Sequence, residues 1–169
     1  MKKIKLLFFS LTLVGTLSLQ SCFYNYYDDD DVPSQSHYSQ YQAVIMSRAQ
    51  LESSIKMTAP KNMIKAGKIY VKDTYIFITD ENKGFHIYDN SNPNAPQLTG
   101  FLEVPGATDM AIKNNTIYIN QAVDLVAVSI NNSQVTVHKR IKNTFPQKIS
   151  PDGWVHYAGE NEIIVDWKS

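Results

Sequence analysis

The sequence predicts an all-β protein made of β-propeller-type blades, with about two four-stranded antiparallel blades in an incomplete ring and one short N-terminal helix. The main observation is an internal repeat, in which Val71–Ile78 aligns with Ile112–Ile119 at an offset of 41 residues. Further along, Phe85–Asp89 aligns with Leu125–Ser129 at an offset of 40 residues. The repeated segments are rich in β-branched and aromatic residues, which favour strands. A repeat of about 40 to 45 residues that contains four strands has the length of a propeller blade.

Residues 1–21 are predicted to be a lipoprotein signal peptide. Three lysines precede an apolar run from Leu6 to Leu19, which is shorter than the roughly 20 residues of a transmembrane helix. The sequence Leu19-Gln20-Ser21-Cys22 resembles a bacterial lipobox, which implies lipid transfer to the Cys22 thiol, cleavage before Cys22 and acylation of the new α-amine. An ordinary cleavable signal with a chance cysteine is the alternative, but Cys22 is the only cysteine in the chain. Two or three acyl chains anchor a protein stably, so we expect it to be held at a membrane without spanning it.

Residues 22–42 are predicted to be a flexible tether that is rich in tyrosine and acidic residues. This segment shows neither helical nor strand periodicity. Asp28–Asp31 has two interpretations. Such a run is often a solvated piece of linker, but it also resembles the signal that exports lipoproteins to the cell surface in some Gram-negative groups. The second interpretation predicts outer-membrane residence with surface exposure.

Residues 43–60 are predicted to form a short strand followed by a helix. Ala43–Met46 is an apolar run that can form a strand. Ser47 and Gln50 have the spacing of a capping box, which begins a helix of about ten residues that ends before Pro60. Because Leu51 and Ile55 give the helix one apolar side, we expect it to lie against a sheet as a lid or a brace.

The first blade is predicted over residues 67–106 and the second over residues 107–142. The strands are expected at 67–72, 74–79, 84–89 and 97–104, and then at 109–113, 116–120, 125–130 and 135–141. Asp73 and Asn114 fall at equivalent tight turns, where Asp and Asn tolerate positive φ. Residues 143–169 form a turn-rich C-terminal segment, and Glu162–Trp167 is predicted to be a strand that starts a further blade with nothing after it.

The residues from Gly84 to Pro96 carry a family resemblance. A strand with the pattern Gly-apolar-x-Ile-x-Asp leads into Asp-x-Ser-x-Pro-x-x-Pro, and this resembles the LVIVD repeat of bacterial lipoproteins. Phe85–Asp89 is the matching strand, and Leu125–Ser129 is its weaker copy. The resemblance covers roughly Tyr41 to Trp167 and implies a β-propeller. It implies no catalytic residues.

The predicted blades do not complete a ring. A closed propeller takes about four to eight blades, and two blades leave sheet faces and edges uncovered. Two explanations are open. The chain is a short or truncated member of the family, or copies of it form a homo-oligomer that completes the ring.

The sequence predicts no catalytic, cofactor-binding or metal site. The four histidines, His37, His86, His138 and His156, lack the spacing of a zinc site, and His86 and His138 are predicted to be strand residues with one side in water. Asp80–Asn82 is rich in oxygen atoms and could contact calcium, but a solvated turn is the more ordinary interpretation. Trp154 and Trp167 are candidate aromatic binding residues, with core packing as the alternative. Tyrosines of the tether could stack on sugars or simply adhere to the domain.

Charge and composition exclude some classes of function. Without residues 1–21, the chain has 13 basic and 16 acidic residues, so its net charge is about −3 and it has no basic field for nucleic acid. We therefore expect a lipid-anchored, envelope-facing binding or scaffold protein without catalysis, whose ligand is a protein or a glycan. A fragment or accessory subunit of a larger propeller enzyme, and a non-functional remnant, are the alternatives.

Overall fold

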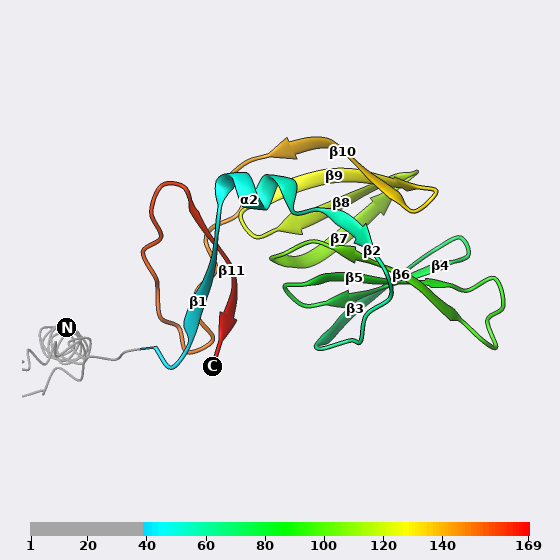
Figure 1. The fold of residues 1–169 in the computed structure, drawn as a ribbon, viewed down its shortest axis with the longest axis horizontal. Coiled ribbons are helices and arrows are strands. Elements are labelled where there is room, and N and C mark those ends of the chain that lie inside the picture. Colours follow the sequence, from blue (N-terminus) through cyan, green and yellow to red (C-terminus); the bar gives the residue numbers. More distant parts are fainter. Residues whose placement is uncertain (1–38) are drawn as a thin grey trace, which may run out of the picture. The chain divides into compact units, whose positions relative to one another are not determined.

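A computed structural model describes residues 39–169 of the chain, which contain eleven strands and one helix. The signal peptide, Cys22 and most of the predicted tether therefore lie outside the described residues. The described part is all-β, with two antiparallel sheets and a separate two-stranded ribbon (Figure 1). No helix among residues 39–169 is long and apolar enough to cross a membrane.

The first blade is an antiparallel meander of β3 to β6. Its strands are β3 (Ala66–Lys72), β4 (Tyr75–Asp80), β5 (Gly84–Asp89) and β6 (Gln97–Glu103), and the short strand β2 (Lys56–Thr58) pairs with the outer edge of β6. Asp73 forms the β3–β4 turn with a φ of 52°. The predicted strands are confirmed to within two residues.

The second blade repeats the same meander with β7 to β10. Its strands are β7 (Ala107–Lys113), β8 (Thr116–Gln121), β9 (Asp124–Asn131) and β10 (Gln134–Ile141). Asn114 forms the β7–β8 turn with a φ of 55°, at the position equivalent to Asp73. The two sheets are propeller-type blades, and they do not close a ring.

The main core lies between the two blades. Alternate residues of each strand face the other blade, as the two-residue period of strands requires. The buried members of this cluster are Phe77, Phe85, Ile87, Leu102, Val104, Ala107, Met110, Ile117, Ile119, Val126 and Val128. Each blade therefore has an inner face, which packs on the other blade, and an outer face on the opposite side.

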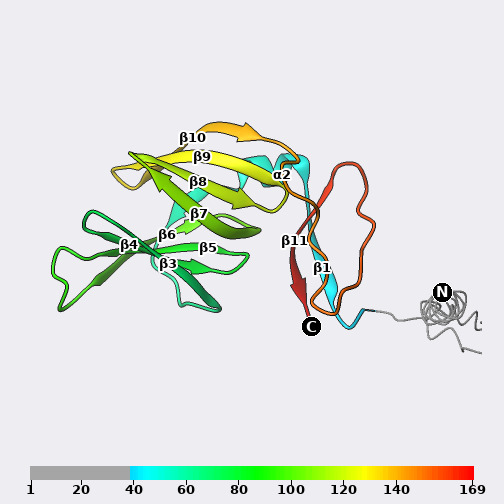
Figure 2. The same ribbon diagram turned by 180° about the vertical axis from the view of Figure 1, so that it is seen from behind.

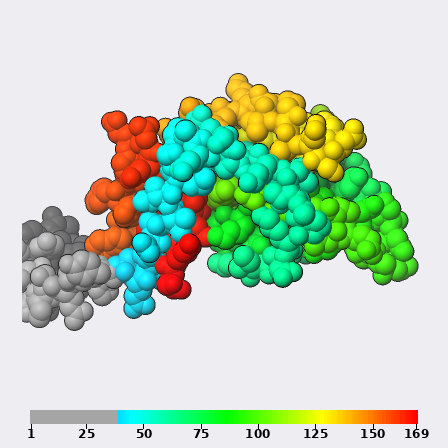
Figure 3. Space-filling view, in the orientation of Figure 1, coloured from blue at the N-terminus to red at the C-terminus, as the bar shows by residue number. Residues whose placement is uncertain are grey.

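The ends of the described chain pair with each other. β1 (Gln42–Ser47) lies antiparallel to β11 (Glu162–Lys168), with Gln42 opposite Lys168. The two strands lie side by side in Figure 2, and the cyan and red segments adjoin in Figure 3. The predicted strand at Glu162–Trp167 is therefore confirmed as β11. β1 supplies its backbone partners, and β11 also packs beside the β8–β9 turn of the second blade.

The helix α2 (Arg48–Ser53) begins as predicted and ends early. The Ser47 hydroxyl accepts a hydrogen bond from the Gln50 amide, and the Gln50 side chain accepts one from the Ser47 amide, which is a complete capping box. The helix has six residues, so the expected length of about ten is wrong. Residues 56–58 pair with β6 instead, and Ile55 and Met57 pack against the main core, which the longer helix would prevent. As predicted, α2 is a brace, since Leu51 is buried in a second cluster with β11.

An ion-paired carboxylate ties α2 to the second blade. The side chain of Asp124, at the start of β9, is fully buried. Its Oδ2 accepts hydrogen bonds from Arg48 at 2.6 Å and from Arg140 at 2.8 Å. Burial alone would raise the pKa of Asp124, but the hydrogen bonds from these two arginines outweigh it and hold the pKa below its ordinary value. Asp124 is therefore ionised at neutral pH and joins segments that are distant in sequence.

Candidate functional site

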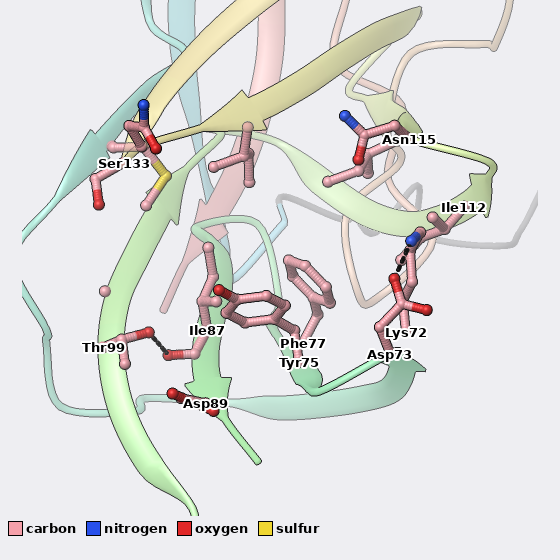
Figure 4. A pocket seen from close by; sticks show the side chains of 15 residues that line it. Lys72, Asp73, Tyr75, Phe77, Ile87, Asp89, Thr99, Ile112, Asn115 and Ser133 are labelled. Carbon is pink, nitrogen blue, oxygen red and sulfur yellow. Dashed lines mark hydrogen bonds and ion pairs between the residues drawn. The ribbon is translucent and has the colours of Figure 1, made fainter. Parts of the chain in front are cut away.

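A cleft of about 370 Å³ opens between the two blades at one end of their strands. It lies at the end that carries the β3–β4, β7–β8 and β9–β10 turns (Figure 4). Its floor is apolar and consists of Met57, Phe77, Ile87, Ile112, Ile117 and Ile130. Its rim is polar and consists of Lys72, Asp73, Tyr75, Asp89, Thr99, Asn115, Asn132 and Ser133. An apolar floor below a few polar groups is the usual composition of a ligand site.

The rim side chains come from tight turns and strand ends. Asn132 and Ser133 form the β9–β10 turn with φ values of 48° and 61°. Two-residue hairpin turns of this kind need positive φ, which selects small polar residues such as Asn, Asp and Gly. The same residue types that satisfy the turns therefore place amide and hydroxyl groups around the cleft.

Tyr75 is the aromatic residue of the rim. It lies at the start of β4 opposite Asp89, and its side chain points into the cleft beside Phe77 (Figure 4). Tyr75 is 47 % exposed, whereas Phe77 is 6 % exposed. Phe77 thus belongs to the floor, and Tyr75 offers one accessible ring with a polar tip.

The three charged groups of the rim are bonded to other groups of the chain. Lys72 forms an ion pair with the neighbouring Asp73. Asp89 accepts hydrogen bonds from the Ser91 hydroxyl at 2.6 Å and from the Ser91 amide at 2.8 Å. These bonds lower the pKa of Asp89, the hydroxyl contributing most. The rim therefore offers a ligand mainly neutral hydrogen-bonding groups.

A polar cluster at the opposite end of the strands joins the first blade to β11. Asp166 accepts a hydrogen bond from Asn82 at 2.7 Å and pairs with Lys83 at 2.6 Å. The Lys148 ammonium donates to the Asn82 side chain at 2.9 Å, and burial lowers the pKa of Lys148. Because these groups satisfy one another, we interpret the cluster as a structural tie.

The structure corrects the prediction for one histidine and confirms it for another. His138, on β10, is exposed and bonds the Ser129 hydroxyl at 2.7 Å, as expected for a strand residue with one side in water. His86 is 1 % exposed, so its predicted wet side is wrong. It packs against the Phe101 ring and lies 3.2 Å from Asp80. Both residues of this pair are buried, and Asp80 is 2 % exposed.

Asp80 has a structural role that the solvated-turn interpretation missed. It is 2 % exposed and accepts hydrogen bonds from the amides of Ile64 and Lys65. Burial would raise the pKa of Asp80, but these bonds and His86 keep it below its ordinary value. Within residues 39–169, no group of three or more His, Cys, Asp or Glu side chains is placed to hold a metal ion.

The remaining candidates lie apart from the cleft. Trp154 is 43 % exposed in the loop before β11, and Trp167 is half-buried with its ring edge-on to His156. Cys22, His37 and most tether tyrosines lie outside the described residues. Sequence reasoning missed the rim residues of the cleft, although the paired turns at Asp73 and Asn114 were the signal that these side chains share one end of the blades.

Comparison with known proteins agrees with this architecture. The family model of the LVIVD repeat matches residues 65–103. Neither a curated protein nor a solved structure matches the chain. The matched residues begin just before β3 and end with β6, so they cover the first blade. Residues 65–103 therefore match the LVIVD repeat, and the two sheets of the described residues are propeller-type blades.

Proposed function

We propose that this chain is a lipid-anchored binding protein of the cell envelope, without catalysis of its own, and that it takes its ligand in the cleft between the blades. The observation that carries the proposal is the composition of the cleft, which has an apolar floor and a rim of amides, hydroxyls and three charged groups that are bonded within the chain. Cys22 would carry the lipid, and the acidic run Asp28–Asp31 supports residence at the outer membrane with exposure at the surface.

The cleft favours a glycan over a protein ligand. A volume of about 370 Å³ lies in the range of small-ligand pockets, whereas a stable protein partner needs about 800 Å² of surface on each side. The rim offers amides, hydroxyls and one accessible tyrosine ring, which suit a ligand that has many hydroxyl groups and an apolar ring face. The charged rim groups Asp73 and Asp89 are engaged within the chain, which supports binding without acid–base chemistry.

Tyr75→Ala is expected to weaken glycan binding by about tenfold, because it removes the accessible ring of the rim and about 1.4 kcal/mol of binding free energy. The measurement is calorimetric titration of the detergent-extracted full chain with a panel of neutral envelope oligosaccharides. Tyr157→Ala is the matched control, since Tyr157 is 93 % exposed and lies outside the cleft. Equal affinity of the two variants, or no binding by the unmodified chain, would contradict the proposal.

Cys22→Ser is expected to abolish lipid attachment, because the thiol is the acceptor of the diacylglyceryl group. The measurement is the mass of the chain purified from membranes, which should contain the acyl groups in the unmodified protein and lack them in the variant. Ser21→Ala is the control, since it keeps a small residue before the cysteine and should leave lipidation intact. An unmodified Cys22 in the membrane-bound protein would overturn the anchor while leaving the binding proposal standing.

A further inference from the structure

The outer face of the first blade is apolar where β3 and β4 lie. Ile69 and Val71 on β3 are 64 % and 66 % exposed. They pair across the strands with Ile78 and Ile76, and Ile76 in turn pairs with Tyr88 on β5. No charged side chain is among these five residues. Large exposed apolar patches are rare on monomeric proteins and usually mark a contact surface.

The internal repeat identifies the kind of surface that fits this face. At an offset of 41 residues, Ile69, Val71, Ile76 and Ile78 correspond to Met110, Ile112, Ile117 and Ile119 of the second blade. At an offset of 40 residues, Tyr88 corresponds to Val128. All five counterparts form the inner face of the second blade, which packs on the first blade. The outer face of the first blade thus corresponds to the inner face of the second blade, but among the described residues no other blade packs on it.

The second blade has the complementary surface on its own outer face. Within the chain, the first blade contacts the second through Tyr70, Phe77, Phe85, Ile87 and Leu102. The repeat offsets give Ala111, Tyr118, Leu125 and Ala127 as the counterparts of the first four residues. Ile141 is the counterpart of Leu102, because Ile141 pairs with Leu125 in the second blade as Leu102 pairs with Phe85 in the first. Every one of these is apolar, and Tyr118 and Ile141 are 38 % and 49 % exposed. Each outer face therefore has a group of apolar residues that corresponds to one side of the internal interface, and on the second blade Lys139 lies opposite Ala127 within this group.

The charged residues at the edges of the blades favour the same packing of one outer face on the other. Lys68 of β3 forms an ion pair with Asp109 of β7, and these two residues are themselves equivalent at the offset of 41. If the interface is repeated between chains, Asp109 of one copy faces Lys68 of the next. The two positions carry opposite charges, so the junction is attractive rather than repulsive.

The rest of the fold leaves room for this contact. Residues 59–65 cover only part of the outer face of the first blade, where Lys61 lies 4.9 Å from the centre of the Phe101 ring and Ile64 and Lys65 bond Asp80. The ribbon of β1 and β11 lies beside the β4–β5 and β8–β9 turns, at the ends of the strands. The half of the face near Val71 and Ile76 remains uncovered by the described residues.

We propose that copies of this chain associate head to tail, with the outer face of the second blade of one copy packed on the outer face of the first blade of the next. Contacts of this type join different surfaces, and they close into a ring when the rotation permits. Since propellers close with about four to eight blades, a closed ring needs two to four copies. A face-to-face pair of first blades would instead leave the outer face of the second blade uncovered. The cleft lies inside each chain, so this proposal does not depend on what the cleft binds.

The test uses two variants of the full chain that each block one face. Val71→Glu places a charge on the outer face of the first blade, and Tyr118→Glu places one on the outer face of the second. The mass of each detergent-extracted protein is measured by native mass spectrometry, which removes the micelle. Val155→Glu is the matched control, because Val155 is 53 % exposed in the loop before β11 and lies on neither face.

The unmodified chain and Val155→Glu are expected to show two to four copies, and each blocking variant alone a single copy. A mixture of the two blocking variants should form a two-chain complex, because each still has the face that the other needs. That complex also shows that both variants are folded. A single-chain mass for the unmodified protein overturns the proposal. A Tyr118→Glu variant that still forms a dimer also overturns it, because this result would indicate that two first blades pack through their outer faces. Failure of the mixture to associate overturns it as well.

Discussion

Gly84→Ala is expected to lower the free energy of unfolding by about 3 to 5 kcal/mol. This range is the sum of the cost of an unfavourable φ at an alanine and the cost of the steric overlap of its Cβ atom with neighbouring atoms. Gly84 begins β5 with a φ of 143°, which side-chain-bearing residues rarely adopt. A Cβ atom at this position would lie 2.0 Å from the Leu102 carbonyl oxygen and 2.9 Å from the Val104 amide nitrogen. Both are backbone atoms of the adjacent strand and its exit, so β5 and β6 would have to separate.

Denaturant unfolding followed by circular dichroism measures this loss. Gly153→Ala is the control, since Gly153 also has a positive φ, of 83°, but nothing lies within 4 Å of its added Cβ. It should therefore show only the backbone cost, about 1 kcal/mol. If the two variants lose the same stability, the close approach of β6 to Gly84 is not what requires glycine there.

Asp124→Ala is expected to cost about 3 to 5 kcal/mol of unfolding free energy, because it leaves two partly buried guanidinium groups without their shared counter-charge. Arg48 and Arg140 both bond the same oxygen of Asp124. Asp124 also accepts a hydrogen bond from the Asn143 amide at 3.0 Å, so α2, β9 and the exit of β10 would all lose a contact. Thermal and denaturant unfolding measure the change.

Glu81→Ala is the matched control, because the Glu81 side chain is 41 % exposed and forms an ion pair with Lys65. Exposed pairs of this kind contribute about 0 to 1 kcal/mol to stability.

The pH dependence of the unfolding free energy distinguishes the contribution of the Asp124 charge from that of its packing. Its pKa is lower in the folded state, so its contribution is complete above about pH 4 and declines as the pH falls through the folded-state pKa. The stability gap between the unmodified chain and Asp124→Ala should therefore narrow in acid, and a gap unchanged down to pH 2 would contradict an ionic role.

The strands could be predicted because their signal is local. Alternating apolar residues and the offsets near 40 locate β3 to β10, and Asp73 and Asn114 locate two turns. The length of α2 could not be predicted, because residues 56–58 form a strand that pairs with β6 and therefore cannot continue the helix. β6 is distant in sequence, so no local pattern shows this pairing. The burial of His86 and Asp80 depends on residues 59–65 crossing the sheet, and no periodicity shows such a crossing.

The residues of the candidate site could not be predicted from the sequence for the same reason. Tyr75 and Asn132 lie in different blades, and only the three-dimensional arrangement brings them to one cleft. Asp124 and its arginines likewise come from three separate segments, so their pairing is a property of the fold. The sequence showed which residues lie in strands and turns, but not which of them meet.

The pairing of β1 with β11 also determines the order in which the molecule can fold. The two meanders consist of neighbouring strands, so they can form soon after they are synthesised. β1 is made before both of them, yet it must wait for β11, with Met46 opposite Ile163. Until β11 has been synthesised, β1 is an unpaired apolar strand. Exposed strands of this kind are bound by chaperones and are prone to aggregate. Formation of the ribbon is therefore expected to be a late, slow step in the folding of this chain.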